Sequence, residues 1–458
     1  MAEEMFRPPI NRAMRVLDRS FFRKSVPISA ARIIDIKTIS KLRSELQKSR
    51  DILFIDRLSN IQPDPVEENA KLGKKCILLR PQVDDKGENK PWSPKVSELE
   101  DANLIKVIPY EVQLDYDYWT YHDIASAVLP SSEEHDEIPS GFTLVGHVAH
   151  LNLRDQYLPY KNLIGEILID KNPGVRTVIN KIDDVGEESE YRTFKYEVLA
   201  GPDDMDVEIR EADCTFRFNY AKVYWNSRLN TEHGRLVDSF AEGDAVCDVM
   251  AGIGPFAVPA GRKKVFVWAN DLNPDSYASL ADAVKRNKVE QYVRSFNDNG
   301  FTFIKTAAAE LLRTDHKVTI TKKQSRTEAA KSAAPAAPVI LKEIVQPKTF
   351  QHYVMNLPAT ALTFLPSFIG LYASPSDRAL LPADSKMPMI HCYCFSTKSE
   401  DNVREGIEIC QEVTRQIGYE ITPETPETRV WDVRDVAPHK RMFCVTFRLP
   451  EEVAFRET

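Results

Sequence analysis

The sequence predicts an α/β protein whose C-terminal part is a doubly wound, Rossmann-like domain. Two observations support this prediction. An apolar run over residues 245–250 ends in Gly252-x-Gly254, and a second run over residues 265–269 ends in Asp271. Short apolar runs bounded by glycine are typical of buried parallel strands. We therefore expect two neighbouring strands of one parallel sheet here.

The same stretch predicts a nucleoside cofactor. Glycine lets the backbone turn tightly and approach a ligand closely, and Asp271, which follows Asp248 by 23 residues, is spaced to hold a ribose diol. The third glycine of the dinucleotide fingerprint is missing, because Phe256 or Ala257 stands at its expected position. A dinucleotide needs its pyrophosphate on a helix N-terminus, whereas S-adenosylmethionine carries no phosphate. The pattern therefore favours S-adenosylmethionine over NAD.

Length and composition limit the number of domains and the class of protein. The chain has 458 residues, of which 43% are hydrophobic and 28% charged, which fits two or three folded domains. No apolar run is long enough to span a bilayer, so we expect no membrane segment. Seven cysteines without paired C-x-x-C sets exclude a zinc frame or a disulfide scaffold, and we expect no metal. Cys392 and Cys394 lie two apart in a probable strand and are expected to be buried thiols.

The net charge of −8 argues against a globally basic nucleic-acid binder, but the charge is uneven. Residues 1–50 hold twelve Lys and Arg against five Asp and Glu, a net charge of +7. Such a surface attracts phosphate, although a solvated basic face or a disordered arm fits equally well. The arginines also resemble a mitochondrial presequence, which Glu3, Glu4, Asp18 and the prolines at 8–9 weaken. We expect a protein of cytoplasm and nucleus, with a mitochondrial matrix fraction.

Three domains are expected along the chain: residues 1–105, an α/β unit over 106–220, and the Rossmann-like domain over 221–458. An Ala/Pro-rich insert at 314–347 lacks apolar bulk and is expected to be a mobile, disordered loop. Periodicity and turn residues predict the following elements: helices over 37–53, 160–170 and 400–417, strands over 75–80, 142–151, 177–181 and 441–449, and a hairpin over 207–218.

A second feature lies downstream of the cofactor pattern. An apolar strand from His352 ends in Asn356-Leu357-Pro358. This is the position of the Asn/Asp-Pro-Pro-Tyr-type loop in amino- and ring-nitrogen methyltransferases, whose amide and carbonyl grip the edge of a base. A plain strand-to-turn with proline has the same pattern.

Taken together, these motifs resemble the archaeal and eukaryotic tRNA (guanine-37-N1) methyltransferases. The likeness covers about residues 140–450, and the segments 19–24 and 114–120 extend it to the N-terminal part of the eukaryotic branch. Its motifs are Tyr191-Arg192, the segment 218–233, the segment 248–256, the segment 270–274, Asn356-Leu-Pro358 and the segment 433–438. The resemblance implies a class I S-adenosylmethionine methyltransferase domain at the C-terminus, preceded by smaller α/β or α+β tRNA-recognition domains.

The resemblance also implies catalytic roles. Guanine N1 carries a proton at neutral pH, and a carboxylate is its natural base; the matching residue is Glu232. Asn230 or Thr231 is expected to cap a helix here, whose dipole would keep Glu232 ionised, although a first-turn acid is common in any helix. Arg192 would hold guanine O6, and Asn356 would orient the flipped base.

On the cofactor side the resemblance points to a set of matching residues. They are His233, Asp248, Gly252, Gly254, Asp271, Leu272, Asn299, Gly300 and Asn356. Asn299 departs from the family's usual acidic residue, yet it can still hydrogen-bond adenine. Arg228 would position the cofactor or the tRNA.

The implied function is methyl transfer from S-adenosylmethionine to N1 of guanosine-37 in tRNA, which also begins wybutosine formation on phenylalanine tRNA. The target base must leave the stack to be reached. We expect a monomer whose partner is tRNA and whose N-terminal domain reads tRNA shape. Three alternatives remain: the related aminocarboxypropyl transferase, a catalytically idle tRNA-binding protein, and an NAD-dependent oxidoreductase.

Overall fold

The computed structural model describes residues 2–84, 92–130, 138–182, 191, 193–321 and 340–457, which form two compact units. Unit 1 comprises Met1–Phe142, Leu151–Asn180 and Val198–Pro202. Unit 2 comprises Thr143–His150, Lys181–Glu197 and Asp203–Thr458. None of the helices in the described ranges combines the length and hydropathy that a membrane span needs.

Unit 1 is built on an antiparallel sheet of strand order β2-β3-β1-β4. Its strands are β1 (Lys24–Ile33), β2 (Ile61–Pro63), β3 (Lys75–Leu78) and β4 (Ile105–Leu114). Helices α2 (Ile39–Lys48) and α4 (Pro94–Asp101) bury Leu42, Leu46, Val96 and Leu99 in one core with the sheet. Strand β4 crosses the domain boundary predicted after residue 105.

The other α-helices and β-strands up to residue 200 are α1 (Ala2–Met5), α3 (Glu67–Lys71), α5 (Tyr121–Val128), β5 (Thr143–Val145), β6 (Val148–Leu151), α6 (Lys161–Lys171), β7 (Thr177–Lys181) and β8 (Tyr196–Ala200). The predicted strand over 142–151 is two strands, because Gly146 adopts a φ of +58° and turns the chain into an antiparallel hairpin. The predicted strand over 177–181 is confirmed.

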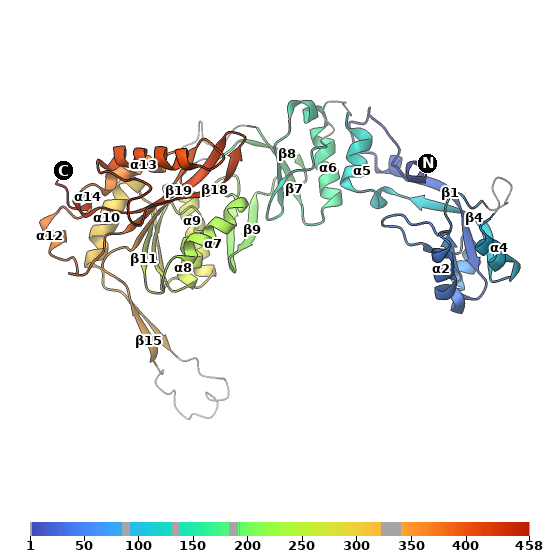
Figure 1. The fold of residues 1–458 in the computed structure, drawn as a ribbon, viewed down its shortest axis with the longest axis horizontal. Coiled ribbons are helices and arrows are strands. Elements are labelled where there is room, and N and C mark those ends of the chain that lie inside the picture. Colours follow the sequence, from blue (N-terminus) through green and yellow to red (C-terminus); the bar gives the residue numbers. More distant parts are fainter. Residues whose placement is uncertain are drawn as a thin grey trace, which may run out of the picture. The chain divides into compact units, whose positions relative to one another are not determined.

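Unit 2 contains the predicted doubly wound sheet, of order β13-β12-β11-β16-β17-β19-β18 (Figure 1). The first five strands are parallel, and β19 pairs antiparallel with both β17 and β18. The strands are β11 (Ala245–Asp248), β12 (Phe266–Asn270), β13 (Val293–Phe296), β16 (His352–Met355), β17 (Met389–Ser396), β18 (Arg429–Ala437) and β19 (Lys440–Arg448). The strand order reverses at β11, so the carboxyl ends of β11, β12 and β16 meet where such sheets bind ligands.

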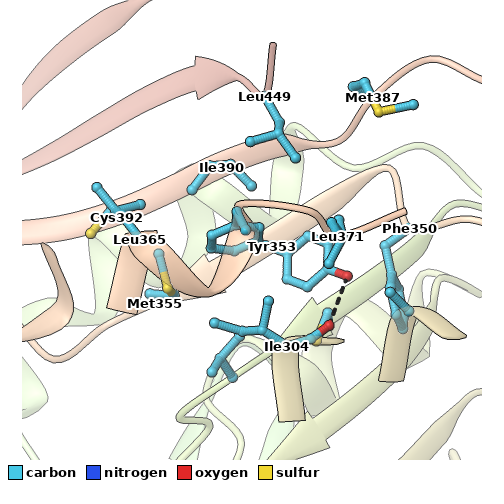
Figure 2. Packing of buried hydrophobic residues seen from close by; sticks show 14 of the residues in the cluster. Ile304, Phe350, Tyr353, Met355, Leu365, Leu371, Met387, Ile390, Cys392 and Leu449 are labelled. Atoms are coloured by element: carbon cyan, nitrogen blue, oxygen red, sulfur yellow. Dashed lines mark hydrogen bonds between the residues drawn. The ribbon is translucent and has the colours of Figure 1, made fainter. Parts of the chain in front are cut away.

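Helices flank this sheet. They are α7 (Asn230–Asp238), α8 (Ala257–Arg262), α9 (Pro274–Arg286), α10 (Gly300–Arg313), α12 (Pro375–Arg378), α13 (Val403–Ile417) and α14 (Glu451–Ala454). Helices α10 and α13 share one buried core with the sheet. In Figure 2 the ring of Tyr353 lies among Ile304, Leu365 and Ile390, and its hydroxyl donates to the Ile304 carbonyl at 3.4 Å. This core fixes β16, the strand that carries Asn356 at its end.

Two further hairpins belong to unit 2. Strands β9 (Asp206–Glu211) and β10 (Cys214–Asn219) confirm the hairpin predicted over 207–218, and Ala212 and Asp213 turn it at φ of 47° and 57°. Strands β14 (Lys317–Thr321) and β15 (Ile340–Val345) pair antiparallel and extend away from the sheet in Figure 1.

The second hairpin corrects the insert predicted over 314–347. Both of its ends are ordered strands, because Val318 and Ile344 are buried between β14, β15 and the domain core. Alternating β-branched residues favour this pairing over a loop. Residues 322–339, where the Ala/Pro-rich sequence lies, fall outside the described residues.

Candidate cofactor pocket and active site

The loop after β11 is shaped by its two glycines. Gly252 and Gly254 have φ of +57° and +94°, which side chains rarely tolerate. A Cβ on Gly254 would meet Leu280 at 2.6 Å. The Gly252 N–H donates to the Asp271 carboxylate at 2.8 Å, so this loop and the end of β12 are held together.

Asp271 is the acidic residue that the spacing predicted at the end of the second strand. Its other oxygen accepts from the Asn273 N–H at 2.9 Å. Burial raises the pKa of Asp271, and the two backbone donors lower it in part. The side chain is therefore fixed at the floor of a pocket rather than free on the surface.

Asp248 ends β11 and is only 1% exposed. Neither of its carboxylate oxygens has a hydrogen-bond partner among the residues that the structure describes. Burial, and next the charge of Asp271, raise the pKa of Asp248 well above its usual range. A buried carboxylate in this state needs a proton or a nearby cation.

A pocket of about 870 Å³ opens at the carboxyl ends of β11, β12 and β16. It is lined by Tyr191, Tyr224, Val249, Met250, Gly252, Asn270, Asp271, Leu272, Asn273, Ser276, Asn299, Gly300, Phe301, Asn356, Leu357 and Phe364. The lining is mostly apolar with few polar groups, which is typical of small-molecule sites.

One side of this pocket is a flat aromatic wall. The rings of Phe301 and Phe364 stack with centroids 3.8 Å apart and planes at 13°. Gly300 lets Phe364 approach, since a Cβ there would lie 3.0 Å from its ring. Asn299 caps α10, where its side-chain oxygen accepts from the Phe301 N–H at 2.9 Å. A planar heterocycle fits beside such a wall.

The pocket brings together Gly252, Asp271, Leu272, Asn299, Gly300 and Asn356 of the predicted cofactor residues. Gly254 shapes the loop below it, and Asp248 lies beneath it beside Asp271. His233 is 4% exposed, and its Nδ1–H donates to the Glu211 carboxylate at 2.6 Å, outside the pocket lining. The Asn356 side-chain oxygen is buried without a partner among the described residues.

Phe256 follows the two glycines of the cofactor loop and has a packing role. Its ring lies 4.8 Å from that of His233 and 6.0 Å from that of Tyr393. It therefore joins the cofactor loop to α7 and β17.

Glu232 lies in the first turn of α7, as predicted, but the cap differs. The N-cap is Leu229, and Asn226 accepts from the Arg228 N–H in the preceding 3-10 turn Ser227–Leu229. The expected cap at Asn230 or Thr231 is therefore wrong, because the 3-10 turn moves the helix start back by one residue. Arg192 lies outside the described residues.

A second pocket of about 1050 Å³ lies in the same unit and shares Tyr224 with the first. It is lined by Thr143, His150, Lys181, Phe194, Tyr220, Tyr224, Trp225, Asn226, Arg228, Pro358, Phe395, Arg434, Val436 and Met442. Asn356 and Leu357 line the first pocket and Pro358 the second, so the loop after β16 separates them.

The second pocket is aromatic and positively charged. His150 stacks on Phe194 at 5.2 Å, and burial lowers the pKa of His150 to about 4, so its ring is neutral at neutral pH. Arg434 carries a buried Nη1 without a hydrogen-bond partner among the described residues. Burial, and next the charge of Arg228, lower the pKa of Arg434. Two like charges at one pocket are stabilised by an anion.

The first pocket fits S-adenosylmethionine. The unpartnered Asp248 carboxylate calls for positive charge, which the sulfonium and ammonium groups of that molecule supply. The aromatic wall suits its adenine, and Asp271 suits a ribose diol. Fold and pocket together define the class I methyltransferases.

Comparison with known proteins identifies the family. Residues 207–319 match the TRM5/TYW2 methyltransferase domain, and residues 121–204 match the TYW2 N-terminal domain. A tRNA (guanine(37)-N(1))-methyltransferase of Aspergillus fumigatus is 54% identical over 99% of this chain and 96% of its own length. The one of Schizosaccharomyces pombe is 41% identical over 96% and 95%. The chain therefore belongs to the family of tRNA (guanine(37)-N(1))-methyltransferases.

Solved structures share the fold. A crystal structure of Trm5b from Pyrococcus abyssi aligns with a TM-score of 0.54 at 19% identity, over 92% of this chain and 99% of the other. The structure of aTrm5 in complex with tRNALeu aligns at 0.55 and 18%, over 92% and 100%.

Several residues of the site had escaped prediction. Tyr224 stands at the junction of the two pockets, and the Phe301–Phe364 pair forms the wall. Arg235 and Tyr393 bind the Glu232 carboxylate. Tyr224 and Arg235 lie in or next to a motif that the sequence contains, whereas Tyr393 lies 161 residues from Glu232, and only the fold brings the two together.

Proposed function

We propose that this protein transfers a methyl group from S-adenosylmethionine to N1 of guanosine-37 in tRNA. One observation supports this most directly: the cofactor pocket and an aromatic, basic pocket adjoin at Tyr224 and at the Asn356-Leu357-Pro358 loop. Transfer of a methyl group from a small cofactor to a nucleotide requires two adjoining sites, one for each molecule. The product is also the starting point of wybutosine formation on phenylalanine tRNA.

In the first pocket, Asp271 holds the ribose of the cofactor, and Asn299, Gly300 and Phe301 hold its adenine. Asp248 offsets its positive charge. When bound, S-adenosylmethionine supplies the methyl group, whose bond to sulfur breaks as the bond to guanine N1 forms. The side chains of the pocket orient this group and exclude water.

The second pocket receives the flipped guanosine. Tyr224 and its neighbouring rings offer a stacking surface for a base. Asn356 hydrogen-bonds the edge of the guanine through its side-chain oxygen, which has no partner among the described residues. Arg228 and Arg434 bind the phosphodiester beside the target nucleotide.

Glu232 acts as the general base that takes the N1 proton, and Arg192 holds O6 as charge develops there. Loss of a base of this kind typically costs about 10²- to 10⁴-fold in rate. The Glu232→Gln variant is therefore expected to keep both binding steps and to lose methyl transfer to that extent.

The direct experiment uses labelled S-adenosylmethionine and unmodified tRNA transcripts that carry G or A at position 37. We expect 1-methylguanosine in the G transcript alone, with S-adenosylhomocysteine as the second product. Methylthioadenosine would instead identify an aminocarboxypropyl transferase, an activity that the match to the TYW2 N-terminal domain makes worth measuring. Binding of tRNA without turnover would identify an idle binder.

We further propose that the protein acts as a monomer in cytoplasm and nucleus, with a mitochondrial matrix fraction. The net charge of +7 over residues 1–50, from twelve Lys and Arg against five Asp and Glu, supports an import signal. Light scattering and import into isolated mitochondria test these two statements separately.

A further inference from the structure

The carboxylate of Glu232 is held by three hydrogen bonds. Arg235 donates from Nε to Oε2 at 2.7 Å and from Nη2 to Oε1 at 2.6 Å. The hydroxyl of Tyr393 donates to Oε1 at 2.7 Å. Glu232 is 6% exposed and Tyr393 is fully buried, so the arrangement lies inside the domain rather than on its surface.

The two oxygens of the Glu232 carboxylate accept different numbers of hydrogen bonds. A carboxylate offers about four lone-pair directions, two on each oxygen. Oε1 uses both of its directions, for Arg235 and Tyr393, whereas Oε2 uses one. A further donor can therefore bind at Oε2 without displacing a protein group.

We propose that Arg235 and Tyr393 are positioning residues that hold the Glu232 carboxylate in one orientation, with a cation beside it, and direct the guanine N1 proton to its Oε2 atom. The proposal rests on the proposed role of Glu232 as the base. In this step the N1–H bond breaks, its electron pair stays on N1, and the proton forms an O–H bond at Oε2. The proton then passes to water after the product leaves.

Arg235 is the cation bound to Glu232, and it donates two of the three hydrogen bonds to that carboxylate. A guanidinium favours the charged form of a neighbouring carboxylate. Among the described residues, the other titratable groups that face the pair are Tyr393 and His391 of β17 and Cys444 of β19. Burial raises the pKa of Tyr393 and of Cys444 and lowers that of His391, so all three are neutral at neutral pH.

Arg235 is itself fixed from outside. Its guanidinium lies 4.9 Å above the ring of Trp431 on β18, and its side chain is 30% exposed. Tyr393 also contacts Phe256, whose ring lies 6.0 Å away at the end of the Gly252–Gly254 loop. The frame around Glu232 is thus continuous with the cofactor loop.

The test is the pH dependence of single-turnover methylation at saturating tRNA and S-adenosylmethionine. In the Arg235→Met variant the acidic limb of the profile is expected to move to higher pH, because the cation beside the carboxylate is lost. The Arg235→Lys variant keeps the charge, so its limb should stay near that of the wild type. Its plateau should fall, since lysine cannot donate two bonds in one fixed plane.

Arg415→Met is the matched control. Arg415 binds Glu412 through the same two atoms at the same i, i+3 spacing, at 2.7 and 2.5 Å, on the exposed side of α13. Its profile should coincide with that of the wild type. Tyr393→Phe frees one direction on Oε1 and should lower the plateau about threefold to tenfold; it also serves if Arg235→Met does not fold.

Different results would contradict the positioning role of Arg235 and Tyr393 and the proposed role of Glu232 as the base. A lowered plateau with an unmoved acidic limb in Arg235→Met would show that Arg235 is merely structural, and an unchanged Tyr393→Phe profile would remove Tyr393 from the proposal. Full activity of Glu232→Gln would instead show that Glu232 is not the general base, which contradicts the proposed function of this residue. Retained tRNA and cofactor binding in each variant shows that the fold is intact.

Discussion

At the scale of single residues, this site contains polar groups that the protein itself does not satisfy. Asp248 and the Asn356 side-chain oxygen are buried without partners in the described part of the chain. Each such group costs about 1–3 kcal/mol until a ligand satisfies it. The protein therefore accepts lower stability without ligand in exchange for preorganised contacts.

Asp248→Asn tests this trade-off through its pH dependence. Folding raises the Asp248 pKa above its ordinary 3.8, so the stability that this group contributes is complete below that value and is lost as pH rises through the raised value. Between about pH 5 and about pH 8 the cofactor-free wild type should lose melting temperature relative to the variant. Thermal melts at both pH values measure this.

The same variant should bind S-adenosylmethionine about tenfold more weakly, equal to about 1.4 kcal/mol, because the charge that offsets the cofactor is gone. Titration calorimetry measures the affinity. Equal pH dependence of the two proteins would show that Asp248 is not the group concerned.

Gly300→Ala tests the aromatic wall. The added Cβ would lie 3.0 Å from Phe364 and 3.1 Å from Val249, closer than ordinary packing allows. We expect the KM for S-adenosylmethionine to rise about threefold to tenfold, since about 1 kcal/mol of fit is lost, while kcat changes less. Gly406→Ala in α13, whose nearest neighbour would be 3.9 Å away, is the control and should leave KM unchanged.

At the scale of elements, the loop after β11 shows why a tight turn is needed. Gly254→Ala places a side chain at φ +94° and 2.6 Å from Leu280. The strain and the clash together should cost about 2–4 kcal/mol of unfolding free energy. Gly73→Ala has a similar φ of +77° but open space around it, so the difference between the two denaturation curves isolates the clash. Equal losses would contradict the packing argument.

Elements with a clear periodic pattern were predictable from the sequence, whereas the residues at which they begin were not. The hairpin over 207–218 and the strand over 177–181 follow from local sequence pattern, and the helix ending at Ile417 follows from the helical spacing of its apolar residues. The start of α7 did not, because the 3-10 turn before it competes with a polar cap. Local pattern carries no information on such a competition.

The candidate site divides in the same way. Residues inside one motif, such as Gly252 and Asp271, could be placed from their spacing. Tyr393 reaches Glu232, and Arg434 reaches the second pocket, only through the pairing of β17, β18 and β19. Partners that distant in sequence require the tertiary fold.

At the scale of the whole molecule, a protein with a net negative charge must bind tRNA, which is a polyanion. The affinity therefore depends on the positively charged side chains that lie at the binding surface. Arg434→Gln should weaken tRNA binding and lower the slope of log affinity against log salt concentration by about 0.9, the value for one lost phosphate contact. Arg415→Gln, which removes an arginine paired with Glu412, should leave the slope unchanged. Filter binding over a salt series measures both. An unaltered slope in Arg434→Gln would show that this arginine contacts the guanine ring of the target nucleotide rather than a phosphate.

The hairpin of β14 and β15 has a practical consequence. Lys317 stands opposite Val345 at its base, and Thr321 stands opposite Ile340 at its outer end, so the chain leaves and returns at paired positions. A passenger sequence spliced between Thr321 and Ile340 would begin and end at neighbouring points, and the seven-stranded sheet would not have to stretch to admit it. This enzyme can therefore be given a fluorescent reporter or an affinity handle in mid-chain, without a fusion at either terminus.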